Sequence, residues 1–266
     1  MNKKKQWSAS SVILLIIGLG LIVGALALLI PTLLDYKKSN DTYEQLNEAY
    51  VKVDESEEEI RADITMEQIN PNWWYEDVDI DVAGIQQVNS DVIGWIRFDN
   101  IEILSYPILY SGDDEKYLRT DIYGNQTTAG CIFLEGANTS DFNDSHSIIY
   151  GHNMRNLSMF GSLKKYKQEG FYQENKYFTI YTNDYAYRYQ IFAFRDVAET
   201  SNFFTIGYGK DDTFQAFIDE MIRSSYENTK VTPTKEDKII TLSTCSTTGN
   251  RFVVHAVRVD EHTLAE

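Results

Sequence analysis

The sequence predicts a mainly β domain, a barrel of eight short strands with a few inserted helices, placed after one N-terminal membrane helix. Two observations predict the barrel: runs rich in Ile, Val, Tyr and Phe recur from about residue 80 onward, and short Gly, Asn and Asp segments separate them. A long apolar run near the N-terminus predicts the membrane helix. The length of 266 residues allows one substantial domain with such an appendage.

The membrane helix is predicted from an uncharged run at residues 6–34, which follows the lysines at positions 3–5. Its apolar centre, residues 12–30, holds about 19 residues and spans about 28 Å as a helix, which is enough to cross a bilayer once. A cleavable signal is the alternative, but its apolar region is shorter, and Ala25-Leu26-Ala27 lies inside the run rather than after it. We therefore expect an uncleaved anchor.

The lysines before the span indicate a cytoplasmic N-terminus and an extracellular domain, although Lys37 and Lys38 on the other side reduce the asymmetry. The expected localisation is the cell membrane, with a single pass. The chain then divides into four parts. They are a cytoplasmic segment at 1–10, an anchor at 11–34, an extracellular stalk at 35–70 and a globular domain at 71–262.

The chain is strongly acidic, with a formal net charge of −16. Such a surface repels nucleic acid and anionic lipid headgroups, so we expect no nucleic-acid partner. Part of the charge is local, because the acidic run at 54–59 lies in the stalk.

The stalk shows a helical pattern around Tyr43, Leu46 and Tyr50 and ends at Asn70-Pro71. Apolar residues at Val82, Ile85 and Val88 then predict a short helix.

The barrel strands are expected between Gly, Asn and Asp turns, and Asn183-Asp184 predicts a hairpin between two of them. The expected ranges are 94–98, 101–109, 130–134, 146–150, 177–182, 185–197, 237–243 and 251–259. Helical patterns interrupt them at 155–166 and at 211–226, where an apolar stripe that reads as core follows an Asp212 cap.

The chain has two cysteines, and Cys245 is the better candidate for chemistry. It follows the β run 238–242, where a strand end can hold a thiol rigidly beside an open surface. A thiolate is a nucleophile, but the ordinary thiol pKa near 8.5 calls for a neighbouring base or cation. Cys131, in AGCIFLE, reads as a small buried strand residue, and a disulfide between the two cysteines is an alternative.

His152 is the strongest candidate base among four histidines, because it follows an apolar strand and a glycine in IIYGHN. A loop or capping role is the alternative. His146 opens that strand as a possible cap, His255 is expected on the surface face of an alternating strand, and His262 lies in a charged tail. The four are too scattered for a metal site, so no metal or cofactor is expected.

Arg251 begins the last strand, and its guanidinium can stabilise the oxyanion of an acyl transfer without losing its own proton. A salt bridge to one of the many carboxylates is the alternative.

These motifs resemble the sortases, the cysteine transpeptidases that attach proteins to the bacterial cell wall. The resemblance rests on TLSTC closely followed by Arg251, on GHN about 90 residues earlier, and on the membrane anchor. The stretch VNSDVIGWIRF and the helix at 211–226 resemble class B in particular. The resemblance implies an eight-stranded sortase-type β-barrel with N-terminal helices and a helix before the penultimate strand.

Carried over residue by residue, the resemblance makes Cys245 the nucleophile, His152 the catalytic histidine and Arg251 the residue that binds substrate and steadies the oxyanion. Ser243 and Leu118 are implied to line the substrate groove. Only five residues separate Cys245 from Arg251, fewer than in many relatives, which leaves the shape of the groove open. A disulfide to Cys131 would consume the nucleophile, so that cysteine is expected to be a buried bystander.

The implied reaction cleaves a C-terminal sorting signal of secreted proteins after threonine, through a thioester, and joins the product to a peptidoglycan precursor amine. An Asn-Pro-x-Thr type signal is implied by class B. Three alternatives remain open at this point: a cysteine protease or amidase that uses water, a pilin-polymerising sortase, and a non-catalytic adhesin.

Overall fold

The computed structural model describes residues 9–54, 72–245 and 249–264, with Ala9 and Cys245 described by their backbone alone. The lysines at 3–5, nearly all of the acidic run at 54–59, Pro71 and the centre of the loop between Cys245 and Arg251 lie outside these residues.

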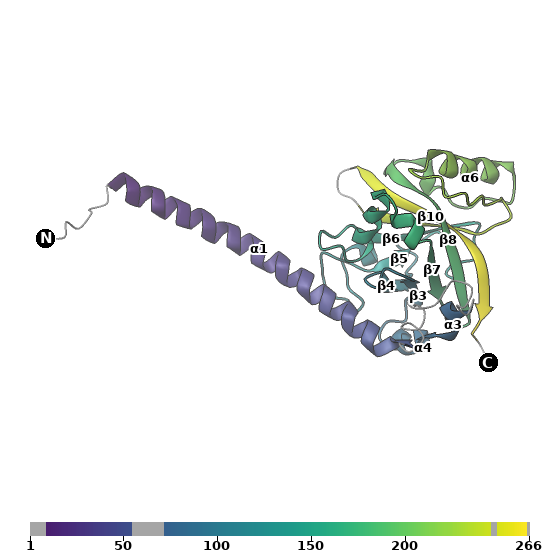
Figure 1. Ribbon diagram of the computed structural model, residues 1–266. Helices are drawn as coiled ribbons and strands as arrows, with labels where there is room; N and C mark the ends of the chain where they lie inside the picture. Colours follow the sequence, from purple (N-terminus) through teal and green to yellow (C-terminus); the bar gives the residue numbers. More distant parts are fainter. Residues whose placement is uncertain (1–8, 55–71, 246–248, 265–266) are drawn as a thin grey trace.

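Eight strands close into a barrel in the order β10-β8-β7-β3-β4-β5-β6-β9 (Figure 1), which confirms the predicted mainly β barrel. Two neighbouring pairs, β4–β5 and β6–β9, are parallel and the others are antiparallel. The strands are β3 (Val92–Phe98), β4 (Ser105–Leu109), β5 (Ile132–Leu134), β6 (His146–His152), β7 (Tyr177–Tyr181), β8 (Tyr185–Ala198), β9 (Ile239–Cys245) and β10 (Asn250–Thr263).

The strand predictions differ from the structure mainly at their ends. The run predicted at 101–109 begins only at Ser105, because Leu104 N donates to Ile101 O at 2.7 Å and closes a turn. A separate two-stranded sheet, β1 (Val51–Val53) with β2 (Val78–Ile80), was not predicted. Three residues are too few to display a strand period.

The helices follow the predicted pattern with two corrections. Helix α6 (Asp212–Ser224) buries its apolar stripe as expected, but its cap is Asp211 rather than Asp212. The Asp211 carboxylate accepts hydrogen bonds from Thr213 N and Phe214 N. The segment predicted as helical at 155–166 forms a 3₁₀ helix, η3 (Phe160–Lys167), which begins after Met159 at a φ of 52°. That left-handed backbone excludes an α-helix that starts earlier.

Shorter helical elements connect the strands. They are α3 (Trp73–Glu76), α4 (Val82–Gln86), η2 (Lys116–Leu118), α5 (Phe171–Glu174) and η4 (Asn202–Phe204).

The N-terminal helix α1 (Ala9–Tyr50) is continuous through the predicted border between anchor and stalk at residue 34. Its first part is apolar and exposed, and its length and composition suit a membrane span. Its last part packs onto the barrel, where Tyr43 and Leu46 join the main hydrophobic core. The stalk residues up to Tyr50 are therefore docked on the domain rather than standing apart from it (Figure 1).

Candidate active site

Three neighbouring strands bring the candidate catalytic residues to one end of the barrel. Parallel strands β6 and β9 end together, and their register places His152 opposite Cys245. Strand β10 runs antiparallel to β9 with Val253 opposite Ser243, so Arg251 lies at the same end. Adjacent strands lie about 5 Å apart. Residues distant in sequence thus meet at one rim because of strand pairing.

His152 is half-buried, and its Nε2 lies 2.7 Å from the carbonyl oxygen of Leu118. A carbonyl only accepts hydrogen bonds, so Nε2 carries a proton. In the neutral ring, Nδ1 is left with a lone pair that can take up a proton. The Leu118 carbonyl therefore fixes both the tautomer and the orientation of the ring.

The pKa of His152 is lowered from its ordinary value, chiefly by burial. The hydrogen bond to Leu118 opposes this shift, whereas the positive charges of Arg119 and Arg251 add to it. The imidazole is therefore mainly neutral at pH 7.

The packing around β6 explains why residue 151, directly before His152, is a glycine. A Cβ at this position would lie 2.4 Å from Ile132 Cδ1 and 2.7 Å from Phe160 Cδ2. The close packing of β6 on these two side chains leaves room for glycine alone, and it holds the adjacent His152 in place.

Arg251 is half-buried, and its guanidinium donates to the carbonyl oxygen of Thr244 at 3.4 Å. Thr244 immediately precedes Cys245, and its own hydroxyl accepts from Phe252 N at 2.9 Å. These bonds tie the first residues of β10 to the end of β9. The cation is thus held beside the backbone of the candidate nucleophile.

Tyr150 and Glu135 adjoin this site, and sequence reasoning missed both. Tyr150 is two residues before His152 on β6, so the two side chains lie on the same face of the strand. Its hydroxyl donates to Glu135 Oε2 at 2.7 Å. Burial and the Glu135 charge raise the pKa of Tyr150, and the nearby charge of Arg251 opposes that shift. The two-residue spacing between Tyr150 and His152 is the sequence signal that could have identified Tyr150.

The two predicted groove residues occupy different environments. Leu118 contributes its carbonyl to His152, and its partly buried side chain packs against the core. Ser243 has an exposure of 0%, and its hydroxyl has no hydrogen-bond partner. Ser243 therefore lies beneath the rim rather than on an open surface in this structure. A groove role for either residue stays a prediction.

The prediction that His255 lies on the surface is wrong, because this side chain is fully buried. It belongs to a chain of hydrogen bonds that crosses the three catalytic strands. Thr241 Oγ1 lies 2.8 Å from His255 Nδ1 and 2.7 Å from His146 Nε2, and His146 Nδ1 lies 2.8 Å from Thr205 O. Residues 252–257 of β10 are buried on both faces of the strand, because α6 and η4 cover the face that carries His255.

The Thr205 carbonyl fixes the direction of this chain. His146 Nδ1 must donate to it, so Nε2 of the neutral ring accepts from the Thr241 hydroxyl, which in turn accepts from His255 Nδ1. His255 Nε2 is then left as a buried acceptor without a partner. Burial lowers the pKa of His146 to about 4 and that of His255 well below its ordinary value.

Cys131 is free and fully buried, and its thiol donates to Thr120 O at 3.2 Å. Burial raises its pKa to about 12, so the thiolate is scarce at neutral pH. Cys131 is therefore not tied to Cys245.

Neither a cofactor nor a metal is implied by the site. In the part of the chain that the structure describes, no group of three or more His, Cys, Asp or Glu side chains is placed to hold a metal ion.

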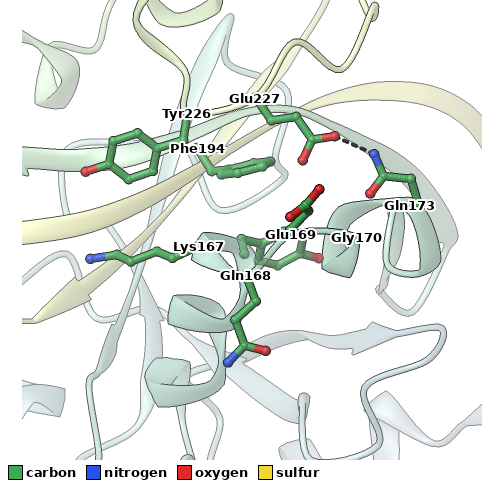
Figure 2. Close-up of a pocket in the computed structure, with 9 residues that line it drawn as sticks. Lys167, Gln168, Glu169, Gly170, Gln173, Phe194, Tyr226 and Glu227 are labelled. Atoms are coloured by element: carbon green, nitrogen blue, oxygen red, sulfur yellow. Dashed lines mark hydrogen bonds between the residues drawn. The ribbon is translucent and has the colours of Figure 1, made fainter.

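A hollow of about 740 Å³ lies elsewhere, between the end of η3, α5 and β8. Figure 2 shows Glu169 and Glu227 facing each other across it, with the amide of Gln173 bonded to Glu227. Its lining contains no candidate catalytic residue. The lining residues are Tyr166, Lys167, Gln168, Glu169, Gly170, Gln173, Phe194, Tyr226 and Glu227.

The chain matches a family model described as a Sortase domain over residues 96–259. It is 32% identical to Sortase B of Listeria monocytogenes over 167 residues, which cover 63% of this chain and 68% of that protein. It is 31% identical to Sortase B of Staphylococcus aureus over 176 residues, which cover 65% of this chain and 72% of that protein.

Solved structures agree with these matches. Sortase B from B. anthracis in complex with AAEK1 superposes with a TM-score of 0.71 and 26% identity, covering 86% of this chain and 99% of that one. Staphylococcus aureus Sortase B superposes with a TM-score of 0.64 and 29% identity, covering 69% of this chain and 87% of that one.

Proposed function

The chain belongs to the sortase family, and from that premise we propose that it joins secreted proteins to a peptidoglycan amine through a thioester on Cys245. Its relatives make it a class B sortase, a cysteine transpeptidase. The reaction exchanges one amide bond for another and therefore needs no ATP.

In the first step the Cys245 sulfur attacks the carbonyl carbon of a threonine in the sorting signal. His152 Nδ1 takes the proton of the thiol as the C–S bond forms and the carbonyl oxygen becomes an oxyanion. The oxyanion then collapses, the C–N bond breaks, and the departing amine takes that proton from His152. The Leu118 carbonyl keeps Nε2 protonated, so Nδ1 is the atom that takes up and delivers this proton. Arg251 stabilises the oxyanion.

In the second step an amine of a wall precursor attacks the thioester. A C–N bond forms, the C–S bond breaks, and the amine proton passes through His152 to the Cys245 sulfur, which restores the thiol and the neutral imidazole. We propose an Asn-Pro-x-Thr type signal, in keeping with class B.

The strand register is the single observation that supports this assignment most directly. It sets His152 opposite Cys245 on β6 and β9, and the next strand, β10, carries Arg251 as its second residue near the same end. This is the arrangement that a nucleophile, a proton donor and an oxyanion-binding cation require around one carbonyl.

We propose that α1 anchors the enzyme in the membrane once, with the N-terminus inside and the barrel outside. The helix is long and apolar enough to span a bilayer. Confinement to one surface raises the effective concentration of membrane-held substrate and acceptor.

The test is incubation of the detergent-solubilised full chain with a library of five-residue sorting peptides and two acceptors, triglycine and a diaminopimelate-containing peptide. Mass spectrometry should detect an acyl-enzyme on Cys245 and amide products that depend on the acceptor. The Cys245→Ala variant should give neither. Acid products alone, at every acceptor concentration, would contradict transfer to an amine.

A further inference from the structure

We propose that the active-site end of the barrel rests on the membrane surface, where a basic rim binds the headgroups of anionic phospholipids. The basic rim consists of Lys37, Lys38, Arg119 and Arg155. The inference rests on the proposed function only in requiring that α1 spans the bilayer.

Helix α1 is docked on the barrel by contacts at three levels along one side of the helix. The Asp35 carboxylate accepts from the Thr127 hydroxyl at 3.2 Å and from Thr128 N at 2.9 Å. Two turns later, the Tyr43 hydroxyl donates to Gly130 O at 2.9 Å. A third contact, from Asn47 to a carbonyl on β4, completes the stripe. A helix held at three levels cannot swing as a flexible tether would.

These contacts set the height of the barrel above the membrane. Asp35 is the first charged residue after the apolar run, so it marks the edge of the hydrocarbon. Its partners Thr127 and Thr128 must then lie in the headgroup layer, which is about 5 to 8 Å deep. Asn156, which donates to Asn40 at 3.2 Å, lies about 8 Å beyond Asp35 along the helix.

The two loops that touch α1 near the membrane are also the loops that flank His152. One of them, residues 119–130, directly follows Leu118, whose carbonyl holds the imidazole. The other, residues 153–159, directly follows His152 itself. In Figure 1 the yellow strand β10 begins at the upper left of the barrel, on the side toward which α1 extends. The catalytic rim therefore faces the bilayer.

The two loops carry a positive charge, unlike the chain as a whole. In loops 119–130 and 153–159 the exposed charged side chains are Arg119 and Arg155. The one acidic residue of these loops, Asp121, is buried and accepts hydrogen bonds from backbone amides.

Helix α1 adds two exposed cations, Lys37 and Lys38, in its first turn beyond the apolar run, where Asp35 is half-buried and the exposed Asp41 follows one turn later. Clustered basic residues beside a membrane helix bind anionic lipid. The net charge of −16 predicts repulsion from such lipid, but the exposed charged side chains of these two loops and of the adjoining turns of α1 are mainly basic.

Tyr123 supplies a probe of this surface. It lies in loop 119–130 and is 54% exposed, and aromatic side chains of this kind favour the membrane interface. Val259 is 48% exposed and is a matched control. It lies eight residues beyond Arg251 on β10, about 26 Å along the strand from the catalytic end.

The experiment attaches an environment-sensitive fluorophore to Tyr123→Cys or Val259→Cys in the full-length Cys245→Ala chain, where the remaining Cys131 is buried. The protein is placed in nanodiscs of phosphatidylcholine with about one third phosphatidylglycerol and a headgroup quencher. We expect quenching at position 123 at least twofold greater than at position 259. Equal quenching at the two positions, in discs that retain the protein at high salt, would overturn the proposal.

A charge variant tests the role of the basic rim. Lys37→Gln, Lys38→Gln and Arg155→Gln together should remove the part of the quenching at position 123 that depends on phosphatidylglycerol. They spare Arg119 and Arg251, which lie near His152.

The matched control neutralises three exposed cations distant from this end, Lys52, Arg223 and Lys230, and should leave the lipid dependence unchanged. If the phosphatidylglycerol-dependent quenching at position 123 falls equally in both variants, or in neither, specific headgroup binding would be contradicted. Failure of the chain to enter discs would overturn the anchoring and this inference together. Peptide transfer in detergent still tests the catalytic function independently.

Discussion

The carbonyl oxygen of Leu118 accepts a hydrogen bond from His152 Nε2 at 2.7 Å, which assigns proton delivery to the opposite ring nitrogen. The same loop carries Arg119, whose charge adds to the lowering of the His152 pKa by burial. One short segment thus fixes which ring nitrogen of His152 transfers the proton and adds to the effect of burial on its pKa.

Replacing Arg119 should change the pH dependence of the reaction. Because its positive charge disfavours the imidazolium, Arg119→Gln should raise the pKa of His152. The acid limb of kcat/KM lies below pH 6.5 in the wild type and should move to higher pH in the variant. The measurement is peptide transfer between pH 4.5 and 9, with Arg223→Gln on α6 as the control. An acid limb that does not move would show that Arg119 does not act on His152.

Gly151→Ala should destabilise the protein and impair catalysis together. The added methyl group would lie 2.4 Å from Ile132 Cδ1 and 2.7 Å from Phe160, so β6 must shift beside His152. We expect a loss of about 1 to 3 kcal/mol in the free energy of unfolding and a fall in kcat/KM.

Ile132→Val removes the methyl group nearest to the clash and should partly rescue the Gly151→Ala variant. Gly209→Ala is the control for stability, because the nearest atom to its added Cβ is 3.5 Å away. Urea denaturation of the single and double variants measures both effects. A clash at this position has no support if Gly151→Ala is as stable as Gly209→Ala.

The protein should lose stability as the pH falls from 6.5 toward 4. The folded-state pKa of His146, about 4, and that of His255 lie below the ordinary histidine value, so the unfolded chain binds more protons in this window. Their contribution is therefore present above pH 6.5 and is lost on acidification, by up to about 1.4 kcal/mol per pH unit for each histidine.

Chemical denaturation at pH 7, 6 and 5 measures this slope. His255→Gln should reduce it, whereas His262→Gln, which removes a partly exposed histidine, is the control. If His255→Gln leaves the slope of the free energy of unfolding against pH unchanged, His255 does not contribute to the loss of stability in acid.

Thr241→Val should be costly although it preserves shape. The hydroxyl bridges His146 Nε2 and His255 Nδ1, and its removal leaves two buried ring nitrogens without partners. We expect the free energy of unfolding to fall by at least about 2 kcal/mol. Thr241→Ser keeps the hydroxyl and should retain more stability than Val, and a reversed order would disprove the bridging role.

Cys131 should resist alkylation in the folded enzyme. Its exposure is 0% and burial raises its pKa to about 12. Iodoacetamide at pH 8, followed by mass spectrometry, should add one group to the wild type and none to Cys245→Ala until the protein is unfolded. Labelling of folded Cys245→Ala would show that Cys131 is accessible.

The sequence by itself determined the barrel, the apolar helix and the candidate residues, because each depends on local pattern. Alternation of apolar residues marks the strands, and the position of Cys245 and His152 at strand ends marks the chemistry. The alternation of residue types along a strand does not show which other element packs on each of its faces. His255 is a polar residue between apolar neighbours, a pattern that predicts a surface position. Helix α6 and η4 nevertheless bury it, so packing between distant segments decided its environment.

The tertiary structure alone also decided three relationships at the active site. The register that opposes His152 to Cys245, the carbonyl of Leu118 on the imidazole, and the docking of α1 at Asp35 each join residues far apart in the chain. A backbone carbonyl has no sequence signature, since every residue carries one. Its role depends on where the fold places it, and no periodicity reports that place.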